Sequence, residues 1–503
     1  MKHVICKITT VILTTLPFMS CNDWLNENDY TYAIATSTFY NTKDEANAAV
    51  MSPLNQMRVA YDANWFATLE INTEYCYPKG VYQTYRGYNG LVNATHITRS
   101  ATNWSAIYRA VLYCNTAIGK LPEAKAMTEA EIKSYLGELR FLRAYNYFSL
   151  VLHWGSVPLR TETNMTEWNL KKTSVREIYD FIIEDLKYAI DNAPDIPRLI
   201  GTPHKLAAKA LLADVCMWTE DYDQAKALAG DVINSGTYSL VNVSNVRDFD
   251  KVFGYDLATS TEEVFYIKTS RTDSRTWNYL SFTAHPQYSI EGKTMLNGNG
   301  YYTHYSDLRN QVIANWDETD LRYHLNLGFY VFGADAYGEY TCLFVKYWDP
   351  YSQGGGANVS IPLIRYTDVL ITYAEASARV AGAPTAESVE MLNRLRRRGY
   401  GHDPDVANPE LDYKPADCNT MEKFIDLLIK EETYERMNEG KHWDLTVRLK
   451  KAQELVGKYY NVDGAWTEIK ERHYLWKIPD SEFNYNKALD QKTDQNPGYS
   501  SDN

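Results

Sequence analysis

Residues 137–159 read G-E-L-R-F-L-R-A-Y-N-Y-F-S-L-V-L-H-W-G-S-V-P-L. Apolar side chains recur there at steps of three and four residues, which places them on one face of a helix. They are Leu139, Leu142, Tyr145, Phe148 and Leu152. Gly155 can adopt the left-handed backbone conformation that commonly ends a helix, and Pro158 prevents the helix from resuming. This stretch therefore predicts a buried helix with a sharp exit.

The same helical pattern recurs on both sides of this stretch. Residues 176–190 form an amphipathic helix in which Ser174 is the predicted N-cap and Glu177 completes a capping box. Residues 205–235 predict two helices joined by a short turn, in an arrangement similar to a tetratricopeptide hairpin. A second such pair is predicted over 366–380 and 388–397. Because these units differ in length, we expect a hairpin array inside a larger fold rather than a uniform solenoid.

The middle of the chain has a different composition. Residues 242–360 are rich in Gly, Asn, Asp, Ser and Tyr, with short strand-like runs such as Glu263 to Ile267. Long ordered loops of this kind often carry function. We therefore expect the ligand-facing part of the molecule here.

Six short motifs, in order along the chain, resemble the SusD/RagB family of surface-exposed nutrient-binding lipoproteins from Bacteroidetes outer membranes. They are E-L-R-F-L-R-A with G-S-V-P-L within 138–159, P-L-I-R-Y-T-D-V-L at 362–370, L-N with R-R-R-G within 392–399, E-R with E-G and W-D-L within 435–445, I-P at 478–479 and Q-N-P-G-Y at 495–499. In our interpretation these motifs are structural: buried Arg–Glu/Asp pairs and turn prolines that stabilise the fold.

The resemblance implies a mainly α fold, an α–α superhelix of tetratricopeptide-like hairpins with an embedded loop-rich region containing short strands. We divide the chain accordingly into a lipoprotein signal peptide (1–20), an N-terminal helical region (21–240), a loop-rich ligand-facing insertion (241–360) and a C-terminal helical region (361–503).

The N-terminus has the pattern of a lipoprotein leader. Lys2 and Lys7 precede an apolar run over 8–19, followed by Ser20 and Cys21. The run is shorter than the ~20 residues that a membrane-spanning helix needs. We therefore predict lipidation at Cys21, with the protein held at the outer membrane and facing the cell exterior.

Charge and cysteine content exclude several classes of partner and site. The formal charge is −13 without a basic run, which argues against nucleic acid as a partner. The cysteines after Cys21 lack a C-x-x-C pair and predict neither a disulfide framework nor a zinc site. No cofactor is expected, and one alternative stays open, a structural calcium ion bound by loop carboxylates. Its candidate ligands are Asp307, Asp317, Asp320 and Asp335.

Aromatic composition is the best indication of a ligand. The chain has 41 Tyr and 12 Trp against 15 Phe, and Tyr and Trp suit half-wet surfaces because one end can hydrogen-bond. They concentrate in two windows, 61–88 and 277–351. A flat ring can stack on the C–H face of a sugar while neighbouring polar groups bind its hydroxyls; the alternative is that these rings pack between helices and loops. The predicted ligand-binding residues are Trp65, Asn72, Tyr75, Tyr77, Tyr82, Tyr85, Arg86, Trp277, Tyr279, Tyr301, Tyr305 and Trp348.

Together these features predict a binding protein without catalytic residues, which captures a glycan. The family resemblance implies delivery to a SusC-like TonB-dependent transporter. One alternative is a peptide-binding, RagB-like member of the family. The other is a surface glycoside hydrolase that uses Glu70 and Glu74 as its carboxylate pair.

Overall fold

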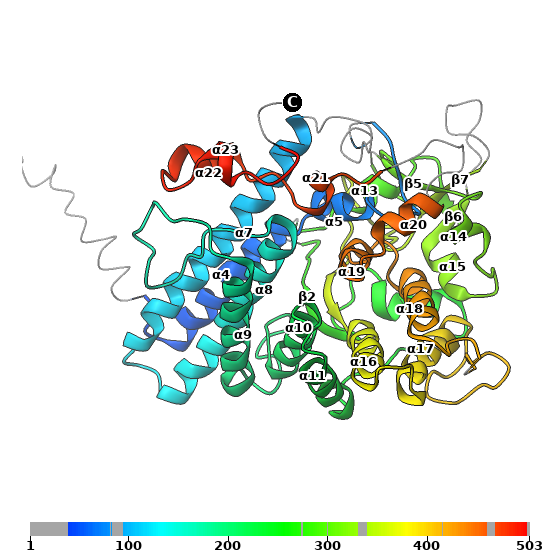
Figure 1. Ribbon diagram of the computed structural model, residues 1–503, viewed down its shortest axis with the longest axis horizontal. Coiled ribbons are helices and arrows are strands. Elements are labelled where there is room, and N and C mark those ends of the chain that lie inside the picture. The colour runs from blue at the N-terminus through cyan, green and yellow to red at the C-terminus, as the bar shows by residue number, and fades with distance from the viewer. Residues whose placement is uncertain are drawn as a thin grey trace, which may run out of the picture.

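The computed structural model describes residues 39–80, 82, 94–272, 275–298, 300–329, 340–414, 416–459 and 468–499. Helices dominate both ends of this part of the chain, as Figure 1 shows. The main ones are α4 (Lys43–Ala60), α5 (Ala63–Glu70), α7 (Ala94–Lys120), α8 (Glu129–Trp154), α9 (Val175–Asn192), α10 (Lys205–Trp218), α11 (Tyr222–Asn234), α16 (Tyr366–Ala381), α17 (Ala386–Gly399), α18 (Met421–Arg436), α19 (His442–Arg448) and α20 (Ala452–Tyr459). The expected mainly α fold is confirmed. No helix in the described ranges is both long and apolar enough to span a lipid bilayer.

The stretch that opened the sequence analysis forms most of α8. Its predicted end at Gly155 is confirmed: the glycine has φ 68° and ψ −127°, so it has positive φ but lies outside the left-handed helical region. Gly137 allows the turn after α9 to approach closely, because a Cβ there would lie 2.5 Å from the backbone nitrogen of Ala193. The predicted capping box of α9 is also present, with Ser174 accepting from the Glu177 amide.

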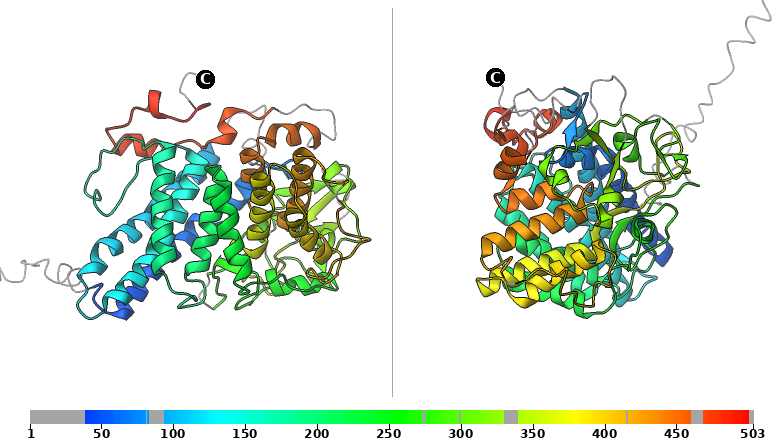
Figure 2. Two further views of the ribbon diagram at one scale, coloured as in Figure 1. Left: turned by 60° about the horizontal axis from the view of Figure 1, so that its bottom comes forward. Right: turned by 90° about the vertical axis from the view of Figure 1, so that its right-hand side faces the viewer.

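Neighbouring helices pack in pairs that follow one another along the chain. α4 packs on α7, α8 on α9, α10 on α11 and α16 on α17, and α11 joins the two halves by packing on α16. The left view of Figure 2 shows the long helices α8 to α11 and α16 to α18 standing side by side. The predicted hairpins over 205–235 and 366–397 are confirmed by these pairs.

The middle region contains short elements connected by long loops. Its strands are β2 (Glu263–Ile267), β3 (Ser289–Ile290), β4 (Lys293–Thr294), β5 (His304–Asp307), β6 (Leu327–Phe329) and β7 (Thr341–Phe344). Its short helices are η2 (Val246–Phe249), α12 (Asp250–Phe253), α13 (Leu280–Thr283), α14 (Gln311–Ala314) and α15 (Leu321–Asn326). β2 pairs with β8 (Ile361–Arg365), which leads into α16. A mixed-length antiparallel sheet has the order β1-β5-β7-β6, with β1 (Tyr77–Pro78) contributed from the N-terminal region.

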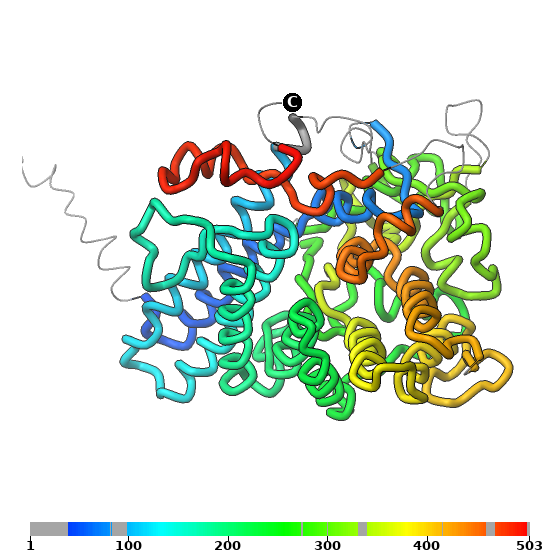
Figure 3. The backbone as a smooth tube through the Cα atoms, in the orientation of Figure 1, coloured from blue at the N-terminus to red at the C-terminus, as the bar shows by residue number. Residues whose placement is uncertain are grey.

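The C-terminal segment returns to the exit of α8. It carries α21 (Glu471–Tyr474), α22 (Asp480–Tyr485) and α23 (Gln491–Asp494), and Figure 3 shows it beside the N-terminal helices. The side chain of Asn496 donates to the carbonyls of Trp154 and Trp476 at 3.0 and 2.7 Å. The Q-N-P-G-Y motif therefore fixes the chain end against the end of α8, as its structural interpretation requires.

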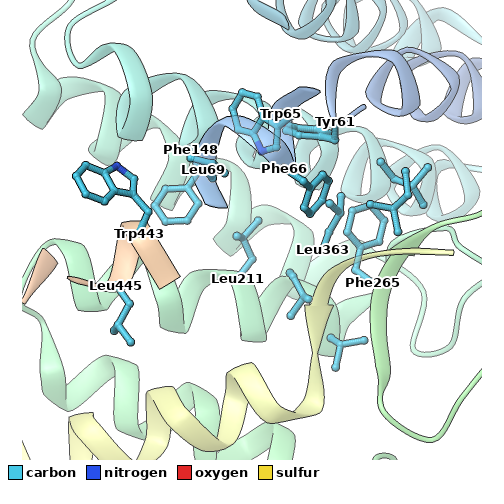
Figure 4. Close-up of a cluster of buried hydrophobic side chains, with 14 of the residues drawn as sticks. Tyr61, Trp65, Phe66, Leu69, Phe148, Leu211, Phe265, Leu363, Trp443 and Leu445 are labelled. Atoms are coloured by element: carbon cyan, nitrogen blue, oxygen red, sulfur yellow. The ribbon is translucent and has the colours of Figure 1, made fainter. Parts of the chain in front are cut away.

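One continuous apolar core extends through the N-terminal, middle and C-terminal parts. Its centre lies around α5, where side chains from α5, α8, α10, β8 and α19 converge (Figure 4). Seven of the eight residues of α5 are buried, so the helix is enclosed by the rest of the protein. The cysteines in the described ranges are free and buried, in agreement with the absence of a disulfide framework. They are Cys76, Cys114, Cys216, Cys342 and Cys418.

Buried ion pairs connect the sequence motifs. Arg365 binds Glu262 at 2.9 Å and Glu439 at 2.8 Å, and both Arg365 and Arg398 bind Glu435. In the opening stretch, Arg143 binds Asp185 of α9 at 2.7 Å. These side chains are almost inaccessible to solvent, so each charge depends on its partner. The structural interpretation of these motifs is confirmed.

Candidate functional site

The two tyrosine-rich windows meet in the four-stranded sheet. Tyr77 in β1 is paired with Tyr305 in β5, and the amide of Lys79 donates to the carbonyl of Thr303 at 2.8 Å. The hydroxyl of Ser306 donates to the Tyr75 carbonyl at 2.7 Å on the buried side of the sheet. Segments far apart in sequence are therefore fixed next to each other by backbone pairing.

Five tyrosines lie along this junction, and we name them the aromatic edge: Tyr77, Tyr301, Tyr302, Tyr305 and Tyr340. The rings of Tyr77 and Tyr305 stack with centroids 5.9 Å apart. The carbonyl of Tyr340 accepts from Leu308, which continues the junction towards β7. Tyr301 and Tyr340 are 55% and 42% exposed, Tyr302 and Tyr305 are half-buried, and Tyr77 is buried. The ring surface that the aromatic edge presents to solvent therefore belongs mainly to Tyr301 and Tyr340.

Polar groups border these rings. The amide of Asn310 donates to the Tyr77 hydroxyl and to the Glu74 carbonyl, both at 2.9 Å. The Lys79 ammonium lies 2.8 Å from the Tyr302 ring centroid, and burial lowers its pKa to about 8. The Arg309 guanidinium lies 4.9 Å from the Tyr340 ring and binds Asp307 at 2.7 Å.

This combination of groups is suited to binding a molecule that has both flat apolar faces and hydroxyls. Tyrosine offers an apolar ring for stacking and a hydroxyl for hydrogen bonding. The ammonium and guanidinium groups donate hydrogen bonds only, whereas the buried Asn310 amide serves to hold Tyr77 in place. The arrangement can therefore select a ligand by shape and by hydroxyl placement without any chemical step.

Several predicted ligand-binding residues lie instead inside the protein. Trp65, Asn72, Tyr75, Trp277 and Tyr279 are each at most 5% exposed. They therefore lie in the interior rather than on an exposed face, and their ligand role stays a prediction. Their side chains lie near the centre of the molecule, because α5 is buried there and Trp277 and Tyr279 pack against its Phe66.

The contacts of these buried rings explain their positions. The Trp65 ring lies 5.1 Å from that of Trp476, and the Trp277 ring lies 5.0 Å from that of Phe66. Their polar ends have internal partners: Tyr279 donates to Asn438 at 3.0 Å and Tyr75 donates to Glu70 at 2.8 Å.

Of the other predicted residues, Tyr82 is buried, Trp348 is half-buried and three lie outside the described ranges. Tyr82 is 1% exposed and donates to Asn64 at 2.9 Å, and its ligand role stays a prediction. Trp348 is half-buried with the Arg247 guanidinium 4.9 Å from its ring, so its ligand role stays a prediction. Tyr85, Arg86 and the lipidation site Cys21 lie outside the described ranges.

The carboxylate pair of the hydrolase alternative belongs to the interior. Glu70 accepts from the Gly440 amide at 2.7 Å, and burial raises its pKa to about 7. Glu74 lies 3.0 Å from His442, which also contacts Glu432. Burial alone would lower the pKa of His442, but the two carboxylates outweigh it and hold that pKa well above the usual value. Glu70 is therefore held by a backbone amide and the Tyr75 hydroxyl, and Glu74 is held by His442, both in the interior of the protein.

The carboxylates proposed for calcium also have protein partners. Asp307 binds Arg309, Asp320 binds Arg322 at 2.7 Å, and Asp317 accepts from Thr319. Asp335 lies outside the described residues. Within the described ranges no group of three or more potential metal-ligating side chains gathers.

Sequence reasoning missed four members of this face. Tyr302 and Tyr340 lay inside the second window but were not selected, and Lys79 and Arg309 were not considered. A usable signal was present, because each of these cations lies within a few residues of a predicted tyrosine in the Y-P-K and Y-S-D-L-R strings.

Comparison with known proteins gives matches over most of the chain. Residues 23–217 match a family described as "Starch-binding associating with outer membrane", and residues 332–499 match one described as "SusD family". A "SusD-like protein P38" from Formosa agariphila is 25% identical over 496 residues, covering 90% of this chain and 92% of the relative.

Solved structures show the same fold. A SusD homolog from Bacteroides thetaiotaomicron superposes with a TM-score of 0.78 at 20% identity, covering 93% of this chain and 99% of that one. The surface glycan-binding protein A from Bacteroides fluxus superposes with a TM-score of 0.72 at 20% identity, covering 91% of this chain and all of that one.

Proposed function

The chain belongs to the SusD/RagB family, and from this premise we propose that it captures an oligosaccharide or polysaccharide on its aromatic edge. The observation that carries the proposal is the pairing of Tyr77 with Tyr305, which joins the two tyrosine-rich windows into one partly exposed surface. A family match described as starch-binding and a structural relative named as a surface glycan-binding protein support a glycan as the ligand.

The proposed mechanism is binding without chemistry. Sugar rings stack on the exposed faces of Tyr301 and Tyr340, while Lys79 and Arg309 provide donors at the border of the rings. Stacking on an aromatic side chain contributes ~1–3 kcal/mol in the comparable case of nucleic-acid bases. A few such contacts are enough for specific capture and still permit release.

The same proposal includes a location and a partner. Lipidation at Cys21 would hold the protein at the outer membrane with the aromatic edge facing the exterior. A SusC-like TonB-dependent transporter would then receive the captured glycan and supply the energy for uptake. The family description that mentions association with the outer membrane supports this location.

Calorimetric titration of the protein lacking residues 1–20 tests the proposal directly. The titrants are a panel of α- and β-linked glucans and other neutral oligosaccharides, with mixed oligopeptides as the second panel. Saturable binding of at least one glycan supports the proposal. Saturable binding of oligopeptides alone would instead establish the peptide-binding alternative. Release of reducing ends from a polysaccharide during prolonged incubation would contradict a binding-only function.

A further inference from the structure

A cavity separate from the aromatic edge lies among the helices, and no residue of the four-stranded sheet lines it. It encloses about 130 Å³ where α5, α8, α10, α16 and α19 converge. Its inner wall is apolar and includes Phe66, Leu69, Phe148, Leu211 and Leu363, which are among the side chains in Figure 4. Its rim carries half-buried residues from four helices: Leu152, Asp214, Trp218, Thr372, Asp444 and Arg448. None of its lining residues belongs to the aromatic edge.

The cationic side chains of this cavity are already paired. Arg436 binds Glu432 and Asp368, each at 2.8 Å, and Lys441 binds Asp368 at 2.5 Å. Arg448 binds Glu375 at 2.6 Å. These cations therefore have carboxylate partners within the protein and leave little positive charge for an anionic ligand.

One acidic group of the cavity, Asp214, lacks such a partner, whereas Glu439 binds Lys346 and Arg365. Asp214 of α10 makes neither a hydrogen bond nor an ion pair with any residue in the described ranges. Burial raises its pKa to about 6, although Arg448 and Arg436 oppose this shift from a distance and Asp368 adds to it. A carboxylate in this position is stabilised by any cation that enters the cavity.

A second carboxylate, Asp444 of α19, faces the same space. Its neighbour His153 is 3% exposed, with Nδ1 2.8 Å from the Ser149 carbonyl and Nε2 3.3 Å from Asp444 in a geometry that makes no hydrogen bond. Asp444 is half-buried at the cavity rim, as Asp214 is. A donor group placed in the cavity would bind the two carboxylates together.

We propose that this cavity binds a compact organic cation, a primary ammonium group on a small apolar body. The ammonium group donates to Asp214 and Asp444, and the apolar body contacts Phe148, Leu211 and Trp218. An ammonium group has three donors and no acceptor, which matches two carboxylates that can only accept when ionised. The enclosed volume and the apolar wall favour an organic molecule over a bare metal ion.

Benzylamine and benzyl alcohol are suitable probes because they share one apolar body and differ in the charged group. We expect the protein lacking residues 1–20 to bind benzylamine saturably in calorimetry or ligand-observed NMR at pH 8, and to bind benzyl alcohol at least tenfold more weakly. Asp214→Asn should weaken benzylamine binding at least tenfold. Asp223→Asn, an exposed aspartate on the neighbouring α11, is the matched control and should bind as the wild type does.

Two results would overturn the proposal. One is the absence of saturable binding of benzylamine at concentrations up to about 10 mM, and the other is equal binding by the wild type and Asp214→Asn. If Asp214→Asn does not fold, Thr372→Trp replaces it, because a bulky ring at the rim should block entry without altering the acceptors. Retained binding by Thr372→Trp would then contradict the assignment. Glycan titration of the same variants should be unchanged, which separates failure of this proposal from failure of the glycan-binding proposal.

Discussion

Tyr77 and Tyr305 occupy paired positions on neighbouring antiparallel strands, and their rings stack with centroids 5.9 Å apart. One belongs to the segment after α5 and the other to the loop-rich middle region. Their contact joins the two tyrosine-rich windows at a surface where Tyr301 and Tyr340 remain exposed. This junction is the structural basis for the proposed glycan site.

Replacing Trp65 tests its assignment to the core. Trp65→Ala should lower the free energy of unfolding by ~3–5 kcal/mol, because it removes a large ring buried against Trp154 and Trp476. Denaturant titration measures this loss, and Trp168→Ala, which changes a tryptophan that is 77% exposed, is the control. A variant that keeps wild-type stability and loses glycan affinity would return Trp65 to the ligand site.

The close approach at Gly137 predicts opposite effects for two glycine substitutions. Gly137→Ala should destabilise the protein by ~1–3 kcal/mol, since the added Cβ would lie 2.5 and 2.8 Å from backbone atoms of Ala193. Gly119→Ala on α7 meets only the Glu162 side chain at 3.6 Å and should stabilise the helix by up to ~1 kcal/mol. Thermal unfolding measures the stability of both variants. Equal changes in stability would contradict the close approach of α8 to the turn at Ala193.

The buried charge network should be sensitive to the loss of one partner. Arg365→Met leaves Glu262 and Glu439 without their shared cation and should cost ~3–5 kcal/mol in the free energy of unfolding. Arg176→Met breaks only an exposed pair with Asp180 and should cost no more than ~0.5 kcal/mol. Denaturant unfolding with similar midpoints for the two variants would contradict a stabilising role for the buried pairs of Arg365.

Glu70 predicts a definite sign for the dependence of stability on pH. Burial raises its folded-state pKa to about 7 from a usual value of 4.5, so the folded protein keeps this proton while the unfolded chain releases it. Stability from this group is therefore present at low pH and is lost as pH rises from about 4.5 to 7. At roughly 1.4 kcal/mol per pKa unit, the loss is on the order of 3 kcal/mol.

Glu70→Gln isolates that contribution, because glutamine resembles the protonated acid and does not titrate. The difference in unfolding free energy between Glu70→Gln and wild type should shift in favour of the variant as pH rises from 5 to 8. Glu184→Gln on the exposed side of α9 controls for a general charge effect. A difference that is constant with pH would show that Glu70 titrates normally.

Local patterns predicted the helices and one strand well. The 3.6-residue period and the Ser174 cap define α9, and the run from Glu263 to Ile267 is β2. These signals depend only on residues close together in the sequence, so the elements can be predicted without knowledge of tertiary contacts. The family resemblance extended them to the whole fold.

The site was predicted only in part because burial is decided by distant contacts. Trp65 and Tyr301 both stand in aromatic-rich windows, yet one is covered by α8 and the C-terminal segment and the other is open. The two-residue strand β1 has no periodicity to reveal it, so the contact between Tyr77 and Tyr305 could not be foreseen. Composition located the windows, and only the structure distinguished core rings from surface rings.

The most direct measurement of the central claim is the affinity of the aromatic edge for the glycan identified by panel titration. Tyr301→Ala and Tyr305→Ala should each weaken binding by ~1–3 kcal/mol in calorimetry, while Tyr485→Ala, an exposed tyrosine on α22, should bind as the wild type does. Wild-type affinity in both folded edge variants would contradict the assignment of ligand capture to this surface.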